Sequence, residues 1–94
     1  MVNKNKKKMI TAVVLIQTER EKVNSVGEKL AEIDGVVEVY SVSGHYDLIA
    51  IMRLETNEEL AELMTEKLTG VEGITETESM IAFRKISKKD ISFG

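Results

Sequence analysis

The sequence predicts an α+β fold of the ferredoxin-like βαββαβ type, an antiparallel four-stranded sheet with two helices on one face. The apolar patterns follow the order strand, helix, strand, strand, helix, strand. The two halves of the chain are also similar, because IDGVVEVYSV at residues 33–42 parallels VEGITETESM at residues 71–80. Each half places a glycine between a helix and a strand. In this fold the first and third strands are central, which agrees with the apolar residues on both faces of these two strands.

The first strand and first helix are predicted from residues 9–34. MITAVVLIQ at residues 9–17 is almost continuously apolar and rich in β-branched residues, which indicates a strand buried on both faces. Thr18 and Glu21 have the spacing of a capping box. The apolar residues that follow at steps of three and four form one helical stripe, and Asp34-Gly35 ends the helix.

The second and third strands flank a turn at Gly44. Residues 36–42 alternate imperfectly but suit a strand, and residues 46–54, YDLIAIMRL, are apolar on both alternating sets. Thr56 and Glu59 repeat the capping-box spacing before a second helix. Residues 74–86 are predicted to form the last long strand.

The net charge of −3 is unevenly distributed along the chain. Residues 1–9 carry +4, residues 10–83 carry −10 and residues 84–94 carry +3. We therefore expect a disordered basic tail at residues 1–9, a folded domain at residues 10–86 and a C-terminal tail at residues 87–94, with a short edge strand at 91–93. A body at −10 repels phosphate, so no direct specific DNA binding is expected.

The composition places further limits on location and assembly. No apolar run approaches the roughly 20 residues that span a bilayer, and no signal peptide is recognisable, so a cytoplasmic location is expected. The chain has no cysteine, which excludes disulfides. Two helices cover only one sheet face, whereas the central strands are apolar on both. The sequence therefore predicts that a second copy covers the open face, in a dimeric α/β barrel-like assembly.

The inventory of chemical groups argues against an enzyme. His45 is the only histidine, so no histidine cluster for a metal exists, and no metal or cofactor is expected. Ser43, His45 and Asp47 are too close together on one turn for a catalytic triad. No glycine-rich phosphate loop or dinucleotide fingerprint is present.

A small polar ligand fits the available residues better. Asp47 could accept hydrogen bonds from an ammonium group, and Gly44 leaves the turn backbone uncovered. Thr77 and Ser79 offer hydroxyls on an edge strand. The alternative is structural: Asp47 caps its own turn, and Thr77 and Ser79 are ordinary strand residues.

Two segments carry a resemblance to a known family. VEVYSVSGHYDLIAIMRL and NEELAELMTEKLTGVEGITETESMIAFRKI resemble the effector-binding (RAM) domain of the Lrp/AsnC, or feast/famine, transcriptional regulators. The resemblance covers about residues 10–86. Its specific parts are the Gly44-x-x-Asp47 turn after VYSVS and the GITETES start of the last strand.

The resemblance implies a domain that dimerises through its sheets, assembles further, commonly to octamers, and binds an amino acid or similar small effector. By position it implies ligand-binding residues in the turn and on the last strand, with the histidine adjusting specificity: Gly44, His45, Tyr46, Asp47, Thr77 and Ser79. Family regulators carry an N-terminal helix-turn-helix domain, whereas only MVNKNKKK precedes the first strand here. We therefore expect a stand-alone version that joins full-length regulators or senses amino acids for another partner.

Two alternatives share the βαββαβ order. An ACT-like amino-acid-sensing subunit of a metabolic enzyme typically has a glycine between its first strand and first helix, where this chain has QTERE. A small dimeric ferredoxin-like enzyme, such as a monooxygenase, would be revealed by activity in a cofactor-free assay.

Overall fold

Four strands form one antiparallel sheet in the order β2-β3-β1-β4 in the computed structural model, which describes residues 9–88 of the chain. β1 pairs with both β3 and β4, so β1 and β3 are central and β2 and β4 are the edges. The predicted ferredoxin-like fold and its central strands are confirmed. The strand bounds are Ile10–Thr18 for β1, Val36–Ser41 for β2, Leu48–Leu54 for β3 and Ile74–Ile81 for β4.

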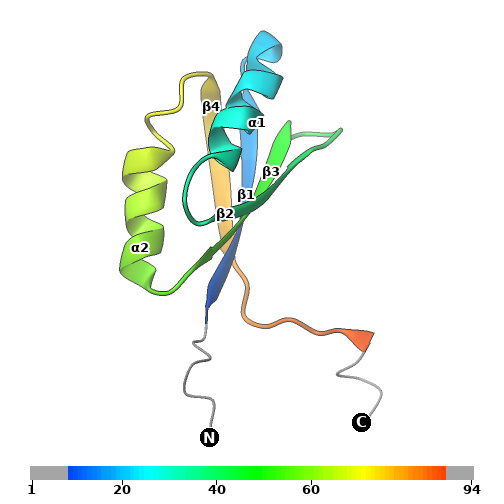
Figure 1. Cartoon of the computed structure of the whole chain (residues 1–94). Helices are drawn as coiled ribbons and strands as arrows, with labels where there is room; N and C mark the ends of the chain where they lie inside the picture. Colours follow the sequence, from blue (N-terminus) through cyan, green and yellow to red (C-terminus); the bar gives the residue numbers. More distant parts are fainter. Residues whose placement is uncertain (1–8, 89–94) are drawn as a thin grey trace, which may run out of the picture.

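Both helices lie on the same face of the sheet (Figure 1). A 3₁₀ turn at Arg20–Lys22 leads into α1, Val23–Ala31. The second helix, α2, spans Asn57–Glu62 and continues as a π-helical turn at Leu63–Lys67. The wider turn is closed by the Leu68 N–H, which donates to the Leu63 carbonyl over 2.9 Å.

The two capping boxes expected from the sequence have different outcomes. Thr56 caps α2 as predicted, because its Oγ1 accepts a hydrogen bond from the Glu59 N–H at 3.0 Å. Thr18 does not cap a helix, so that prediction is wrong. It is the last residue of β1, and its hydroxyl donates to the Glu19 carbonyl instead. The intervening 3₁₀ turn delays the start of α1 to Val23.

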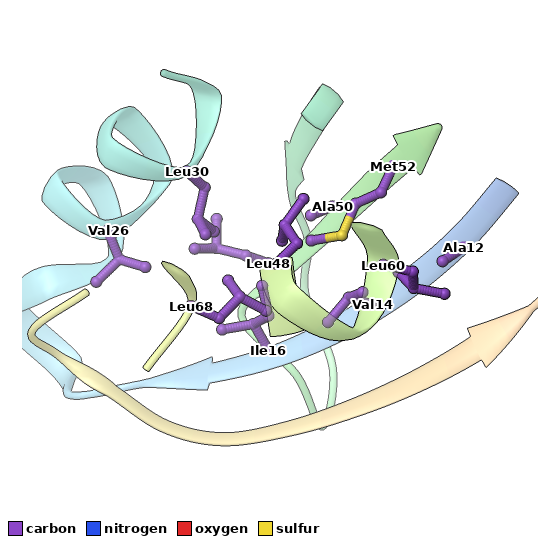
Figure 2. Packing of buried hydrophobic residues seen from close by; sticks show 11 residues of the cluster. Ala12, Val14, Ile16, Val26, Leu30, Leu48, Ala50, Met52, Leu60 and Leu68 are labelled. Carbon is purple, nitrogen blue, oxygen red and sulfur yellow. The ribbon is translucent and has the colours of Figure 1, made fainter. Parts of the chain in front are cut away.

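The core lies between the sheet and the two helices (Figure 2). Alternate residues of β1 and β3 point into it, and apolar residues of α1 and α2 cover them. In the part of the chain that the structure describes, the buried hydrophobic side chains all belong to this one cluster: Ala12, Val14, Ile16, Val26, Leu30, Leu48, Ala50, Met52, Leu60, Leu63 and Leu68.

Within the described residues, no helix lies over the opposite face of the sheet (Figure 1). Side chains of directly paired residues point to the same side of a sheet, so the strand register identifies the residues of this face. Its centre is apolar, and Tyr40 and Met80 remain 50% and 46% exposed. We call this surface the open face: Thr11, Val13, Leu15, Gln17, Glu38, Tyr40, Ile49, Ile51, Arg53, Glu76, Glu78 and Met80.

β4 is shorter than the strand predicted at residues 74–86. It ends at Ile81, which pairs with Ala12, and the Ala82 N–H still donates to the Thr11 carbonyl. β1 begins at Ile10, so it offers little more backbone with which the strand could pair. Residues 82–88 run away from the sheet (Figure 1). The expected strand at residues 91–93 and nearly all of the expected basic tail lie outside the described residues.

Candidate functional site

The turn between β2 and β3 projects a glycine into solvent. Gly44 has φ +130°, a conformation that side-chain-bearing residues rarely adopt. Apart from its two chain neighbours, no residue in the 9–88 range has an atom within 4 Å of the position its Cβ would take. The turn is closed by the Val42 N–H, which donates to the Asp47 carbonyl at 3.0 Å. Because no described residue outside the turn packs against it, the Gly44 backbone is open to a ligand or to another chain.

Asp47 fastens the turn to the end of β1. Its N–H donates to the Ile16 carbonyl at 2.9 Å, and its Oδ2 accepts from the Thr18 N–H at 2.9 Å. The Gln17 side chain adds a third link by donating to the His45 carbonyl at 2.7 Å. The Asp47 carboxylate therefore binds a residue from a distant strand rather than an N–H of its own turn. Its Oδ1 has no hydrogen-bond partner among residues 9–88.

Tyr46 reaches across to the far edge strand. Its hydroxyl donates to Glu78 Oε1 at 2.6 Å, and its ring meets the His45 ring edge to face at 5.0 Å. The hydrogen bond to Glu78, together with partial burial and the nearby negative charges, raises the pKa of the Tyr46 phenol. Nothing in the sequence indicates that the turn reaches Glu78 on β4.

Thr77 and Ser79 do not share a face with this tyrosine contact. Thr77 pairs with Ile16 and Ser79 pairs with Val14, both of which point into the core, so the two hydroxyl side chains lie on the helix side of β4. Glu78 pairs with Leu15 on the open face. The structure thus separates Ser79 and Thr77 from Tyr46 by the thickness of the sheet.

A shallow depression collects several polar groups around the turn. It has a volume of about 380 Å³, and it brings His45 and Asp47 together with two residues that the sequence had not indicated, Arg20 and Thr75. Arg20 was missed because it was expected inside a helix, whereas it lies in the 3₁₀ turn that follows β1. We call this site the Asp47 depression: Gln17, Thr18, Arg20, Val23, His45, Asp47 and Thr75.

A second depression adjoins the first. It has a volume of about 330 Å³, lies between β4 and the π-helical turn that follows α2, and shares Thr75 with the Asp47 depression. Thr77 lines it together with apolar side chains such as Met64 and Leu68. Ser79 lines neither depression. Of the six predicted residues, His45 and Asp47 therefore line the same depression, and Gly44 precedes them in the turn. Thr77 lines the adjoining depression.

A larger depression of about 450 Å³ lies elsewhere, beside Gly35 and α2. Its charged lining is mostly acidic and includes none of the predicted residues. No group of three or more residues that could hold a metal ion occurs within residues 9–88. In the same part of the chain, no helix is long and apolar enough to cross a membrane.

The chain belongs to the Lrp/AsnC family, since the family model of the Lrp/AsnC ligand binding domain matches residues 11–91. This match places it in that family rather than among the ACT domains. The family is one of regulatory ligand-binding domains. None of the curated proteins compared with the chain matches it.

Several solved structures are similar to it. The protein TTHA0845 from Thermus thermophilus is 44% identical, covers 84% of this chain and 99% of its own, and has a TM-score of 0.79. The hypothetical protein PHS023 from Pyrococcus horikoshii is 37% identical over 81% of this chain and 92% of its own, with a TM-score of 0.76. The transcriptional regulator NMB0573 from Neisseria meningitidis, solved as a complex with L-Met, is only 10% identical, with a TM-score of 0.75 over 83% of this chain and 52% of its own.

Proposed function

We propose that this domain is a regulatory sensor that binds the charged end of a free amino acid in the Asp47 depression. It would assemble through the open face, and ligand binding to the assembly would regulate transcription. The observation that carries the proposal is the pairing of opposite charges in one depression. Asp47 offers a carboxylate and Arg20 offers a guanidinium, which match the ammonium and carboxylate groups of a zwitterion.

The Asp47 carboxylate is oriented before any ligand arrives. Oδ2 is held by the Thr18 N–H, which leaves Oδ1 for a ligand ammonium group. A side chain whose rotamer is already fixed loses less entropy on binding, so this bond favours recognition. The alternative in which Asp47 caps only its own turn has no support in the contacts of the carboxylate.

Neighbouring groups would complete the site. Thr75 and the open backbone at Gly44 can hydrogen-bond a polar ligand end. Thr77 and the apolar wall of the adjoining depression would meet a ligand side chain that extends past Thr75. Tyr46 would hold the turn in place through Glu78 rather than touch the ligand. Ser79 could take part only through another copy of the chain.

The likeness to NMB0573 supports an amino-acid ligand, because that protein was solved with L-Met on the same fold. The apolar open face supports assembly, since a contiguous exposed apolar surface usually marks an interface. A homodimer is the simplest way to cover it, and octamers or joint assemblies with full-length regulators would extend it.

The proposal is tested by isothermal calorimetry with whichever amino acid most raises the melting temperature. Asp47→Asn keeps an oxygen for the Thr18 N–H but removes the charge, and Arg20→Gln removes the opposite charge. Each lost charge-assisted hydrogen bond contributes about 1.5–3 kcal/mol, so each variant should bind about tenfold to a hundredfold more weakly.

Matched controls are Asp34→Asn and Lys29→Gln, which make the same charge changes at exposed positions outside the depression. They should bind like the unmodified protein. Equal weakening in the controls would assign the effect to overall charge rather than to the site. No thermal response to any amino acid would contradict the proposal itself.

A further inference from the structure

Thr75 lies at the boundary between the two depressions beside the turn. It lines the Asp47 depression, which holds the charged groups, and it also lines the adjoining depression, whose wall is apolar. We infer that Thr75 sets the ligand selectivity of the site by admitting a long apolar side chain into the adjoining depression. The inference rests on the proposed amino-acid site, and it names the class of amino acid that this site accepts.

A β-bulge places Thr75 at this boundary. Gln17 of β1 pairs with Glu76, and Thr18 pairs with Ile74. Thr75 is therefore an extra residue of β4 that has no direct partner on β1. Such a bulge interrupts the regular alternation of side chains along a strand and often re-aims one of them beside a binding site. This irregularity explains why one residue lines both depressions.

Neighbouring backbone groups at the end of β1 hold the two depressions together. The Thr18 N–H donates to Asp47 Oδ2 at 2.9 Å, and the Glu19 N–H donates to the Gly73 carbonyl at 2.8 Å. Gly73 has φ +109°, and a Cβ there would lie only 2.8 Å from a side chain of α1, so the start of β4 is closely packed. The separation between the Asp47 carboxylate and Thr75 is therefore fixed before a ligand binds.

The adjoining depression suits an apolar side chain. Its charged lining residue, Glu76, pairs with Gln17 and therefore lies on the open face rather than on the helix side of β4. On the helix side the wall is formed by four apolar residues: Met64, Leu68, Val71 and Ile74. A charged group at the end of a ligand side chain would lose water against this wall without gaining a partner of opposite charge.

The volume of the adjoining depression favours a long side chain. It measures about 330 Å³, whereas one water molecule occupies about 30 Å³ in the liquid. The depression therefore has room for a side chain of several carbon atoms. Each methylene group that moves from water to an apolar site strengthens binding by about fourfold. We expect affinity to rise from alanine through norvaline to norleucine, because each adds methylene groups to the one before.

The first test measures this selectivity in the unmodified full chain. By isothermal calorimetry, the dissociation constant for L-norleucine should be at least about tenfold lower than the constant for L-alanine. L-lysine and L-glutamate, whose side chains are long but charged, should bind at least about tenfold more weakly than L-norleucine. An affinity for L-norleucine that is no higher than the affinity for L-alanine overturns the inference.

The second test changes the boundary residue. Thr75 is exposed, so Thr75→Leu should fold, and its larger side chain should lower the ratio of norleucine affinity to alanine affinity at least about tenfold. A purely structural defect would weaken both ligands alike and leave this ratio unchanged. The matched control, Thr65→Leu, makes the same exchange at an exposed position outside both depressions and should keep the ratio of the unmodified protein. An unchanged ratio in Thr75→Leu also overturns the inference.

Failure of this inference is distinguishable from failure of the proposed function. If alanine or a polar amino acid binds as tightly as norleucine and Asp47→Asn weakens that binding, the amino-acid site is correct and the selectivity assigned to Thr75 is wrong. If no amino acid binds to the unmodified chain, the proposed function and this inference are both wrong.

Discussion

Ile51→Lys places a charge at the centre of the open face. Ile51 pairs with Val13 on β1 and with Glu38 on β2, and its side chain is only partly covered within one chain. In a symmetric dimer the change occurs on both partners. Because Ile51 is already partly buried in one chain, a dimer gains only part of the roughly 1.5–3 kcal/mol of a fully buried isoleucine, so the pair loses about 1–2 kcal/mol before any cost for burying the charges is added.

This loss corresponds to a dissociation constant raised by about tenfold, at about 1.4 kcal/mol for each factor of ten, and the desolvation of the two lysine charges raises it further. The isolated domain should still fold, because the substitution faces away from the core. The directly opposite Glu38 carboxylate also offers the new ammonium group a favourable cross-strand partner. The expected product is therefore a folded monomer rather than an unfolded chain.

Sedimentation velocity over a range of protein concentrations measures the association, and circular dichroism checks the fold. The control Ala61→Lys introduces the same charge on the exposed side of α2 and should remain associated. A dissociation constant for Ile51→Lys within threefold of the unmodified value would refute the reasoning that this face is an interface.

Three further predictions concern the cap of α2, the Tyr46 hydrogen bond and binding to DNA. Thr56→Ala removes the cap of α2 and should cost about 1 kcal/mol, lowering the melting temperature by about 4–8 °C, whereas Thr18→Ala should change it much less because Thr18 caps no helix. Glu78→Gln should lower the raised pKa of the Tyr46 phenol toward its ordinary value, which an ultraviolet titration measures. Because the pKa is raised in the folded state, the protonated phenol stabilises that state. This contribution to stability is complete below about pH 10 and is lost as the pH rises through the folded-state pKa. Duplex DNA should bind only weakly and without sequence preference, and a sequence-selective footprint that survives about 200 mM salt would contradict this.

The fold could be predicted from the sequence because the patterns that indicate it are local. Double-sided apolar strands identified β1 and β3 as central, and the repeated helix–glycine–strand junction is borne out by Gly35 and Gly73, which have φ of +101° and +109°. The end of β4 could not be predicted, because it depends on where β1 begins rather than on the residues of β4 itself. Thr18 failed as a cap for a similar reason, since β1 extends to include it.

The candidate site was only partly predictable. The Gly44–Asp47 turn could be found as a short motif, but the partners of Asp47 and Tyr46 come from β1 and β4, about thirty residues away in each case. Which face Ser79 occupies is decided by its pairing with Val14 of β1. No periodicity within β4 itself reveals that register. The sequence analysis therefore assigned the Thr77 and Ser79 hydroxyls to the same site as the turn.

Native mass spectrometry of the full chain, with and without a pool of the twenty amino acids, tests the central claim most directly. It reports the assembly and the bound mass in one spectrum. The account predicts a dimer or a multiple of it, with a mass increase of one amino acid per chain that Asp47→Asn loses. A monomer that gains no mass from any amino acid would contradict it.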